Sequence, residues 1–206
     1  MSTSFHSSNS IFQDLPIRYI HPDRACEWLP DVPSSVAKQL SENGRLWVRL
    51  SRIIIHRYDL ESCPAISGNK DHSIAMLDQA TLKQVVEIGG AMWHGKNLSK
   101  LIDKTALSVA LAAIDEGTYR LAVAHAELAP PAAHSHHSNA VPPSHDAIIL
   151  NGKLCFISWL NALPGFLSKR IRLKFPMEFL SETPSPDHET YGPAIMRKSA
   201  EGFVHD

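Results

Sequence analysis

The sequence predicts an all-α protein, mostly helical and folded as a single compact domain. Three observations predict this fold class: apolar residues recur at helical spacing over most of the chain, prolines and glycines fall between these segments, and residues 147–163 are apolar on nearly every side. With 206 residues, of which 44% are hydrophobic, the chain can bury a core without disulfides or metals. We expect residues 1–10 to be a disordered tail, residues 11–176 to form the helical domain and residues 177–206 to be a loose tail.

Composition and charge argue against several classes of protein. Lysines and arginines number 20 against 21 acidic residues, so the net charge of -1 provides no general attraction to nucleic acid or to an anionic membrane. Cys26, Cys63 and Cys155 form no CxxC pair, which argues against a zinc ribbon and a disulfide framework and fits a reducing compartment. The N-terminus has no signal segment, and the most apolar stretch, residues 106–114, is shorter than the roughly 20 residues of a membrane span. We therefore expect a cytoplasmic protein that is not inserted in a membrane.

The first elements are short because prolines interrupt them. Pro16 and Pro22 forbid a continuous helix over residues 11–22, so we expect an extended segment there, anchored by large side chains. These anchors are Phe12, Leu15 and Tyr19. A short helix can follow with Pro22 in its first turn, and another is expected from Pro33 to about Gly44, a natural C-cap.

Residues 45–60 give a strong helical pattern. The apolar face of this helix consists of Leu46, Leu50, Ile53 and Ile54. On another side, basic residues recur at helical spacing and form a stripe that consists of Arg45, Arg49, Arg52 and His56. Such a stripe is either an ordinary solvated helix face or a docking surface for an acidic protein.

Two further regions have a helical period. In residues 71–93, the glycine pair Gly89-Gly90 either kinks the helix or lets another element pack closely. Residues 97–128 give the longest periodic signal, with Gly117 as a point where it can divide into two helices. The apolar face of that signal consists of Leu107, Leu111, Ile114, Leu121 and Leu128.

The last third of the chain mixes patterns. Residues 129–146 hold two Pro-Pro pairs and are expected to form a flexible, His- and Pro-rich loop. Residues 147–163 predict a helix at the centre of the domain, because they are apolar all round. In residues 166–176, apolar and charged residues alternate, which is typical of a short strand. The prolines that follow Met177 indicate the loose tail.

The densest group of possible metal ligands lies in the His- and Pro-rich loop and consists of His134, His136, His137 and His145. A metal site needs fixed geometry and supporting hydrogen bonds, which such a loop does not supply, so we expect a solvated linker here. The sequence contains no GxSxG elbow, phosphate loop, GxGxxG fingerprint or HExxH pair. We therefore expect no catalytic residues, no cofactor and no metal, and a protein that is not an enzyme.

Candidate binding residues lie in two basic groups and one aromatic segment. The stripe of Arg45, Arg49 and Arg52 is the first candidate for a partner interface. A second basic group consists of Lys169, Arg170, Arg172 and Lys174. Tyr19 and His21 are further candidates, although support of the fold is the simpler interpretation of both. Because the chain has no recognisable nucleic-acid module, we expect a protein partner rather than nucleic acid.

An ordered set of segments resembles a known family. The segment FQDLPIRYIHPDR carries a Phe-x-x-x-Pro-x-x-Tyr-aliphatic-His-Pro pattern, with Phe12, Pro16, Tyr19, Ile20, His21 and Pro22 at the matching places. Residues 77–102, with the turn at His94-Gly95, and residues 151–176, with a Gly-to-Trp-Leu helix, continue the resemblance in the same order. Over residues 11–176 the chain is similar to the SctK family, which includes YscK and PscK, sorting-platform proteins of bacterial type III secretion systems.

The resemblance implies a cytoplasmic adaptor with no catalytic group. Such a protein links the SctQ-type spoke protein to the cytoplasmic domain of the SctD-type inner-membrane ring, and meets the SctL-type stator and the ATPase only indirectly. It is then peripherally associated with the inner-membrane base of the injectisome. Two alternatives stay open: a secretion chaperone or regulatory binding protein of the same apparatus, and a small metal-dependent enzyme that uses the histidine loop.

Overall fold

The computed structural model describes residues 12–60, 70–131 and 141–204. All regular structure in these ranges is helical, and no strand occurs in them. The prediction of an all-α fold is therefore confirmed for this part of the chain. Within the same ranges, no helix combines the length and the apolar character needed to cross a lipid bilayer.

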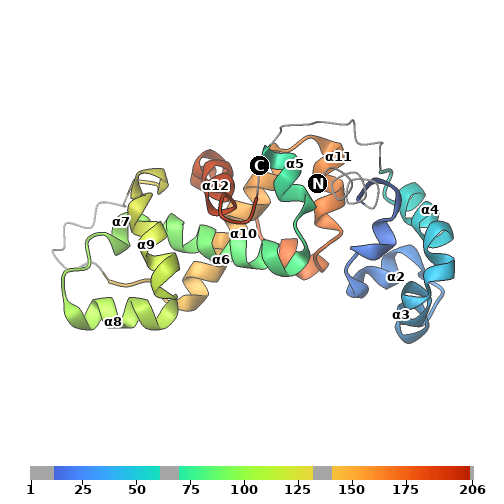
Figure 1. Ribbon diagram of the computed structural model, residues 1–206, viewed down its shortest axis with the longest axis horizontal. Helices are drawn as coiled ribbons and strands as arrows, with labels where there is room; N and C mark the ends of the chain where they lie inside the picture. Colours follow the sequence, from blue (N-terminus) through green and yellow to red (C-terminus); the bar gives the residue numbers. More distant parts are fainter. Residues whose placement is uncertain (1–11, 61–69, 132–140, 205–206) are drawn as a thin grey trace, which may run out of the picture. The chain divides into compact units, whose positions relative to one another are not determined.

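The chain divides into two compact units, the first from residues 1–79 and 163–181 and the second from residues 80–162 and 182–206. The helices of the first unit (Figure 1), with 3₁₀ turns marked η, are η1 (Pro16–Arg18), η2 (Pro22–Arg24), α2 (Ala25–Trp28), α3 (Ser34–Glu42), η3 (Gly44–Leu46), α4 (Trp47–Arg57), α5 (Lys70–Met76), α11 (Gly165–Arg172) and η5 (Met177–Leu180). Those of the second unit are α6 (Gln79–Trp93), α7 (Gly95–Leu98), α8 (Lys104–Ala113), α9 (Glu116–Ala124), η4 (Ala126–Leu128), α10 (His145–Ala162) and α12 (Pro186–Ser199).

The N-terminal segment is partly helical, which corrects the expectation of an extended run over residues 11–22. One helical turn precedes η1, which begins at Pro16. A proline is tolerated at the first position of a helical turn, because its missing N–H would have no partner there. Phe12 is buried, and the Tyr19 hydroxyl donates a hydrogen bond to the Phe12 carbonyl oxygen at 3.0 Å. Both residues therefore anchor the segment, as predicted.

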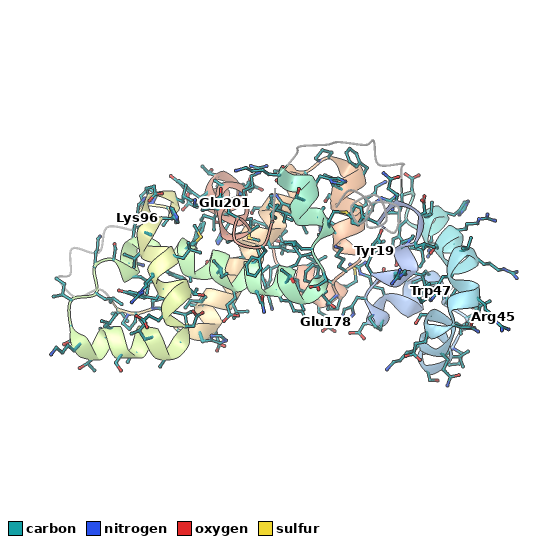
Figure 2. The ribbon with its side chains drawn as sticks, in the orientation of Figure 1. Tyr19, Arg45, Trp47, Lys96, Glu178 and Glu201 are labelled. Atoms are coloured by element: carbon teal, nitrogen blue, oxygen red, sulfur yellow. The ribbon has the colours of Figure 1, made fainter. Side chains whose placement is uncertain are left out.

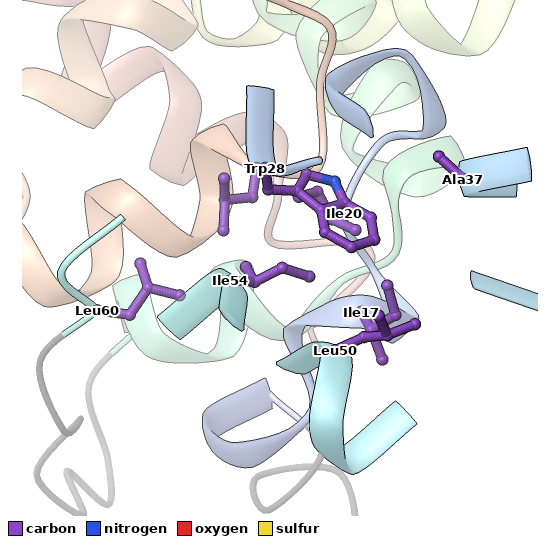
Figure 3. Packing of buried hydrophobic residues seen from close by; sticks show 8 residues of the cluster. Ile17, Ile20, Trp28, Ala37, Leu50, Ile54 and Leu60 are labelled. Atoms are coloured by element: carbon purple, nitrogen blue, oxygen red, sulfur yellow. The ribbon is translucent and has the colours of Figure 1, made fainter. Parts of the chain in front are cut away.

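The core of the first unit gathers η1, α2, α3 and α4. Its centre is formed by Trp28, Leu50 and Ile54, with Ile17 and Ile20 packed beside them (Figure 3). Burying each of these side chains contributes roughly 1.5 to 3 kcal/mol to stability. Ile53, which was predicted on the same apolar face, is 38% exposed, because one step along a helix turns a side chain by about 100° from its neighbour.

Residues 166–176 do not form a strand, and α11 occupies most of this stretch. The alternation of apolar and charged residues misleads here, because Arg170 and Lys174 are buried, with 2% and 3% of their surface exposed. In a helix, residues three or four apart share one face, and Leu167, Arg170 and Ile171 all point into the unit. The charged side chains of Arg170 and Lys174 therefore belong to the core rather than to a solvated strand face.

The core of the second unit depends on glycines that let helices touch. A Cβ on Gly90 would lie 1.9 Å from the carbonyl oxygen of Ile148, and a Cβ on Gly152 would lie 2.1 Å from that of Val86. No side chain fits at either place, so the backbones of α6 and α10 are in direct contact. The Gly89-Gly90 pair was predicted either to kink the helix or to let another element pack closely, and the structure shows the close packing. Helix α10 is buried over much of its length, as the apolar pattern predicts.

The prediction of a loose C-terminal tail is wrong for residues 186–199, which form α12 against α10. Ile195 and Met196 are fully buried. A Cβ on Gly192 would lie 3.0 Å from the Cα of Cys155, so the two helices approach closely at this point. Pro193, one of the prolines on which the prediction of a loose tail rested, lies inside α12 directly after Gly192.

The long periodic region of residues 97–128 is divided among α8, α9 and η4. The division falls at Ile114 and Asp115, where the Asp115 carboxylate accepts a hydrogen bond from the Thr118 N–H at 3.0 Å and caps α9. Because the helices are separate, the predicted apolar positions do not form one buried face: Ile114 is 4% exposed and Leu111 is 38% exposed.

Candidate interaction surfaces

The basic stripe lies on the exposed side of η3 and α4. Leu50, Ser51 and Ile54 are buried on one side of α4, and the opposite side consists of exposed residues. The exposed basic residues are Arg45, Arg49, Arg52 and His56, as the helical spacing predicts. Arg45 extends away from the body of the helix (Figure 2).

The charge of this stripe has no acidic partner in the described part of the chain. No hydrogen bond or ion pair joins the side chains of Arg45, Arg49 or Arg52 to any described residue. The helix from Trp47 to Arg57 contains no aspartate or glutamate. The stripe therefore presents uncompensated positive charge, which is the property that a docking surface for an acidic partner needs.

The helix that carries the stripe is firmly held at both ends. Near its start, the indole N–H of Trp47 donates to the Ser41 carbonyl oxygen at 2.8 Å. Beyond its end, Asp59 adopts the left-handed conformation with φ 48°, and the Lys169 ammonium donates to its carbonyl oxygen at 2.9 Å and its carboxylate at 3.1 Å. The arginines therefore project from a fixed backbone.

Tyr19 and His21 serve the fold more than the surface. Tyr19 is half-buried and stacks on Phe12, with ring centroids 5.4 Å apart. The backbone N–H of His21 donates to the Leu173 carbonyl oxygen at 2.7 Å, and its imidazole accepts from the Asp23 N–H at 3.3 Å. These contacts tie the N-terminal segment to the chain after α11.

The second basic group is only partly accessible, because two of its four members, Arg170 and Lys174, are buried. The Arg170 guanidinium donates to the carbonyl oxygens of Phe12 and Gln13 at 3.1 and 3.0 Å. The Lys174 ammonium donates to the carbonyl oxygen of Ala75 at 2.7 Å and lies 5.3 Å from the centroid of the Phe12 ring. Burial lowers the pKa of Lys174 to about 7, against the opposing effect of the Asp78 carboxylate. Both side chains stabilise the first unit from inside and are therefore not candidates for contact with a partner protein.

A partly buried polar network in the second unit was not predicted from the sequence. The Asn151 amide lies between two imidazoles, with its nitrogen 3.1 Å from His94 Nε2 and its oxygen 3.0 Å from His188 Nε2. His188 also lies 2.7 Å from the Ser185 hydroxyl and stacks on Trp93 with ring centroids 3.9 Å apart. Burial lowers the pKa of both histidines. The sequence marks His94 only as a turn residue, and nothing in it links Asn151 to His188.

Of the histidine cluster, only His145 is described. It starts α10 and is exposed, with Nδ1 3.0 Å from the Ala113 carbonyl oxygen. His134, His136 and His137 lie outside the described residues. Across the described ranges, no three His, Cys, Asp or Glu side chains come together in a metal-binding group.

These features define the class of protein: the described residues form two all-α units, and the first unit carries a basic helix face that has no acidic partner among them. A family model described as YOP proteins translocation protein K (YscK) matches residues 8–194, and the chain belongs to this family. The resemblance to the family that includes YscK is thus confirmed. The match also continues beyond residue 176, where the resemblance seen in the sequence ends, and includes most of α12.

Individual relatives agree with this membership. The chain is 23% identical over 172 residues to the nodulation protein NolU of Rhizobium fredii and to that of Sinorhizobium fredii (strain NBRC 101917 / NGR234), covering 82% of this chain and 76% of each relative. Among solved structures, it is similar to the cytoplasmic domain of the type III secretion sorting platform protein PscK from P. aeruginosa, with a TM-score of 0.51 over 96% of this chain and 97% of that one. At 18% identity, this likeness shows the fold alone.

Proposed function

We propose that this chain is a cytoplasmic, non-enzymatic adaptor in the sorting platform of a bacterial type III secretion system. In this role it links an SctQ-type spoke protein to the cytoplasmic domain of an SctD-type ring protein at the inner membrane. The observation that carries the proposal is the match of the YscK family model over residues 8–194. The likeness to PscK, a sorting platform protein, supports it at the level of the fold.

The architecture suits an adaptor, because an adaptor needs two surfaces that bind different proteins. Each of the two units has its own buried core, so each can present a surface on a stable support. In the first unit, the stripe of Arg45, Arg49 and Arg52 is the candidate for one of these surfaces. Tyr19 and His21 contribute by holding the segment beneath it in place.

Co-purification from cells that express the whole secretion cluster tests this function. Tagged full-length chain is expected to recover both the SctQ-type and the SctD-type protein, with the SctL-type stator and the ATPase recovered only through the SctQ-type protein. A strain without the SctQ-type protein checks that last step, because the tagged chain should recover neither the stator nor the ATPase from it. Recovery of a secreted substrate in place of the platform proteins would favour a chaperone, and recovery of none of them would end the proposal.

A further inference from the structure

We propose that the exposed face of α4 binds an acidic amphipathic helix of a protein partner. The α4 face is defined by the basic stripe, which begins in η3, together with the two aliphatic residues beside it, and consists of Arg45, Val48, Arg49, Arg52, Ile53 and His56. The inference rests on the proposed function, since it specifies the chemistry of one of the partners that an adaptor requires.

The charge of the α4 face selects an acidic partner. Three guanidinium groups project from the face without an ion pair to any described residue. The acidic residues nearest in sequence are Glu42 and Asp59, and the carboxylate of Asp59 is already 3.1 Å from the Lys169 ammonium. All three cations of the stripe are arginines, whose planar groups bind carboxylates with two parallel hydrogen bonds, which a lysine ammonium does not do.

The spacing of the arginines fits a second helix. Arg45 in η3 and Arg52 in α4 are seven residues apart, with Arg49 between them, and seven residues of an α-helix make about two turns and span about 10 Å. A partner helix with carboxylates at positions i, i+4 and i+7 repeats this spacing along one side. When the two helices lie along each other, each guanidinium can meet one carboxylate.

The aliphatic residues argue for a protein partner over a membrane. Val48 is 57% exposed and Ile53 is 38% exposed, and they lie on opposite sides of the stripe. A helix that binds a membrane surface turns its apolar side toward the acyl chains and keeps its basic residues at the margins. The α4 face has the reverse order, with the charges in the centre and the aliphatic side chains at the margins. A partner helix with aliphatic residues beside its carboxylates covers both kinds of group.

A synthetic peptide tests the proposal with the full-length chain. The probe is a fluorescent helical peptide with glutamates at i, i+4 and i+7 flanked by leucines, and a second peptide has glutamines in place of the glutamates. We expect the chain to bind the glutamate peptide at least about tenfold more tightly than the glutamine peptide at about 0.15 M salt, with the difference growing at lower salt.

Three variants separate the contributions of charge and apolar contact. The triple reversal R45E/R49E/R52E is expected to abolish binding of the glutamate peptide. The matched control K83E/K100E/K104E makes the same change in net charge at exposed lysines of the second unit and is expected to alter binding less than roughly twofold, because these lysines are not part of the α4 face. The double variant V48S/I53S should weaken binding several-fold without changing its salt dependence. Circular dichroism confirms that each variant keeps the helical fold.

Three results would overturn the proposal. The first is failure of the wild-type chain to bind the glutamate peptide. The second is unchanged binding by V48S/I53S, which would leave charge as the sole contributor. The third is tighter binding to vesicles of anionic phospholipid, or to a DNA duplex, than to the peptide, which would assign the face to phosphate groups instead.

The proposal and the adaptor function fail in different ways. If R45E/R49E/R52E still recovers the SctQ-type and SctD-type proteins at wild-type levels, the α4 face is not the interface and the adaptor function stands. If the wild-type chain recovers neither protein but binds the glutamate peptide through the α4 face, the adaptor function fails and the helix-binding surface stands.

Discussion

At the scale of single residues, Asn151 holds the half-buried His94 in its neutral form and also forms a hydrogen bond with the buried His188. Its amide nitrogen donates to the Ala147 carbonyl oxygen at 2.8 Å and faces His94 Nε2, which must therefore act as an acceptor. Its oxygen accepts from His188 Nε2. A proton on His94 Nε2 would place two donors against each other and turn the Asn151 amide away from one of its other partners.

This network predicts that acid destabilises the second unit. Burial lowers the pKa of His94 and of His188 below the ordinary value of 6.5, so the unfolded chain binds protons at a pH where the folded chain does not. The contribution of both residues to stability is complete above pH 6.5 and is lost as the pH falls below it. Urea unfolding at a series of pH values should show this decrease.

Matched variants identify the source of the acid effect. The variant H94Q/H188Q should flatten the pH dependence of the unfolding free energy, whereas H56Q, at an exposed position of α4, should leave it unchanged. An equal acid effect in the wild-type chain and in H94Q/H188Q would show that other groups are responsible. His72 is one such group, because burial also lowers its pKa.

The buried guanidinium of Arg170 provides a second prediction at this scale. R170M should destabilise the first unit by about 2 kcal/mol, because the carbonyl oxygens of Phe12 and Gln13 lose a charged donor inside the core. R120M removes an exposed ion pair with Glu116 and should cost no more than about 0.5 kcal/mol. Chemical denaturation of both variants provides the comparison, and equal effects would contradict the structural role of Arg170.

Single residues differ in how far the sequence reveals their role. The positions of Arg45, Arg49 and Arg52 follow from helical spacing alone, so their common exposed face could be predicted. The network around Asn151 could not, because its histidine partners lie 57 and 37 residues away along the chain. Only the tertiary packing of α6, α10 and α12 brings these residues together.

At the scale of the elements, the contact between α6 and α10 depends on two glycines. G90A and G152A should each destabilise the second unit by about 3 kcal/mol or more, because the added methyl group would meet the backbone of the other helix. G165A is the control, since a Cβ at that position meets nothing within 4 Å. Thermal unfolding followed by circular dichroism measures the three variants, and equal midpoints for all of them would contradict the close contact.

Helices were missed where the sequence pattern had two physical explanations. In α11 and just after it, the buried basic residues Arg170 and Lys174 alternate with apolar ones, and only their carbonyl partners distinguish this pattern from a strand. In α12, the Gly192-Pro193 pair resembles a break, although Gly192 is where the helix approaches α10. By contrast, the central position of α10 could be predicted, because a helix that is apolar on all sides is usually buried.

At the scale of the whole molecule, the division into two units has no local signal in the sequence. The first unit combines residues 1–79 with residues 163–181, and the second unit is interrupted in the same way. The contacts that join these distant segments include Arg24 to the Phe175 carbonyl oxygen at 2.6 Å and Lys174 to that of Ala75 at 2.7 Å. Patterns within single elements therefore predict one domain and give no sign of this division.

The central claim is that this chain bridges two other proteins, and a reconstituted capture assay tests it most directly. The cytoplasmic domain of the SctD-type protein is fixed to beads, and purified SctQ-type protein is added with or without the full-length chain. The adaptor function predicts that the SctQ-type protein is retained only when the chain is present. Retention without the chain, or no retention with it, would contradict the bridge.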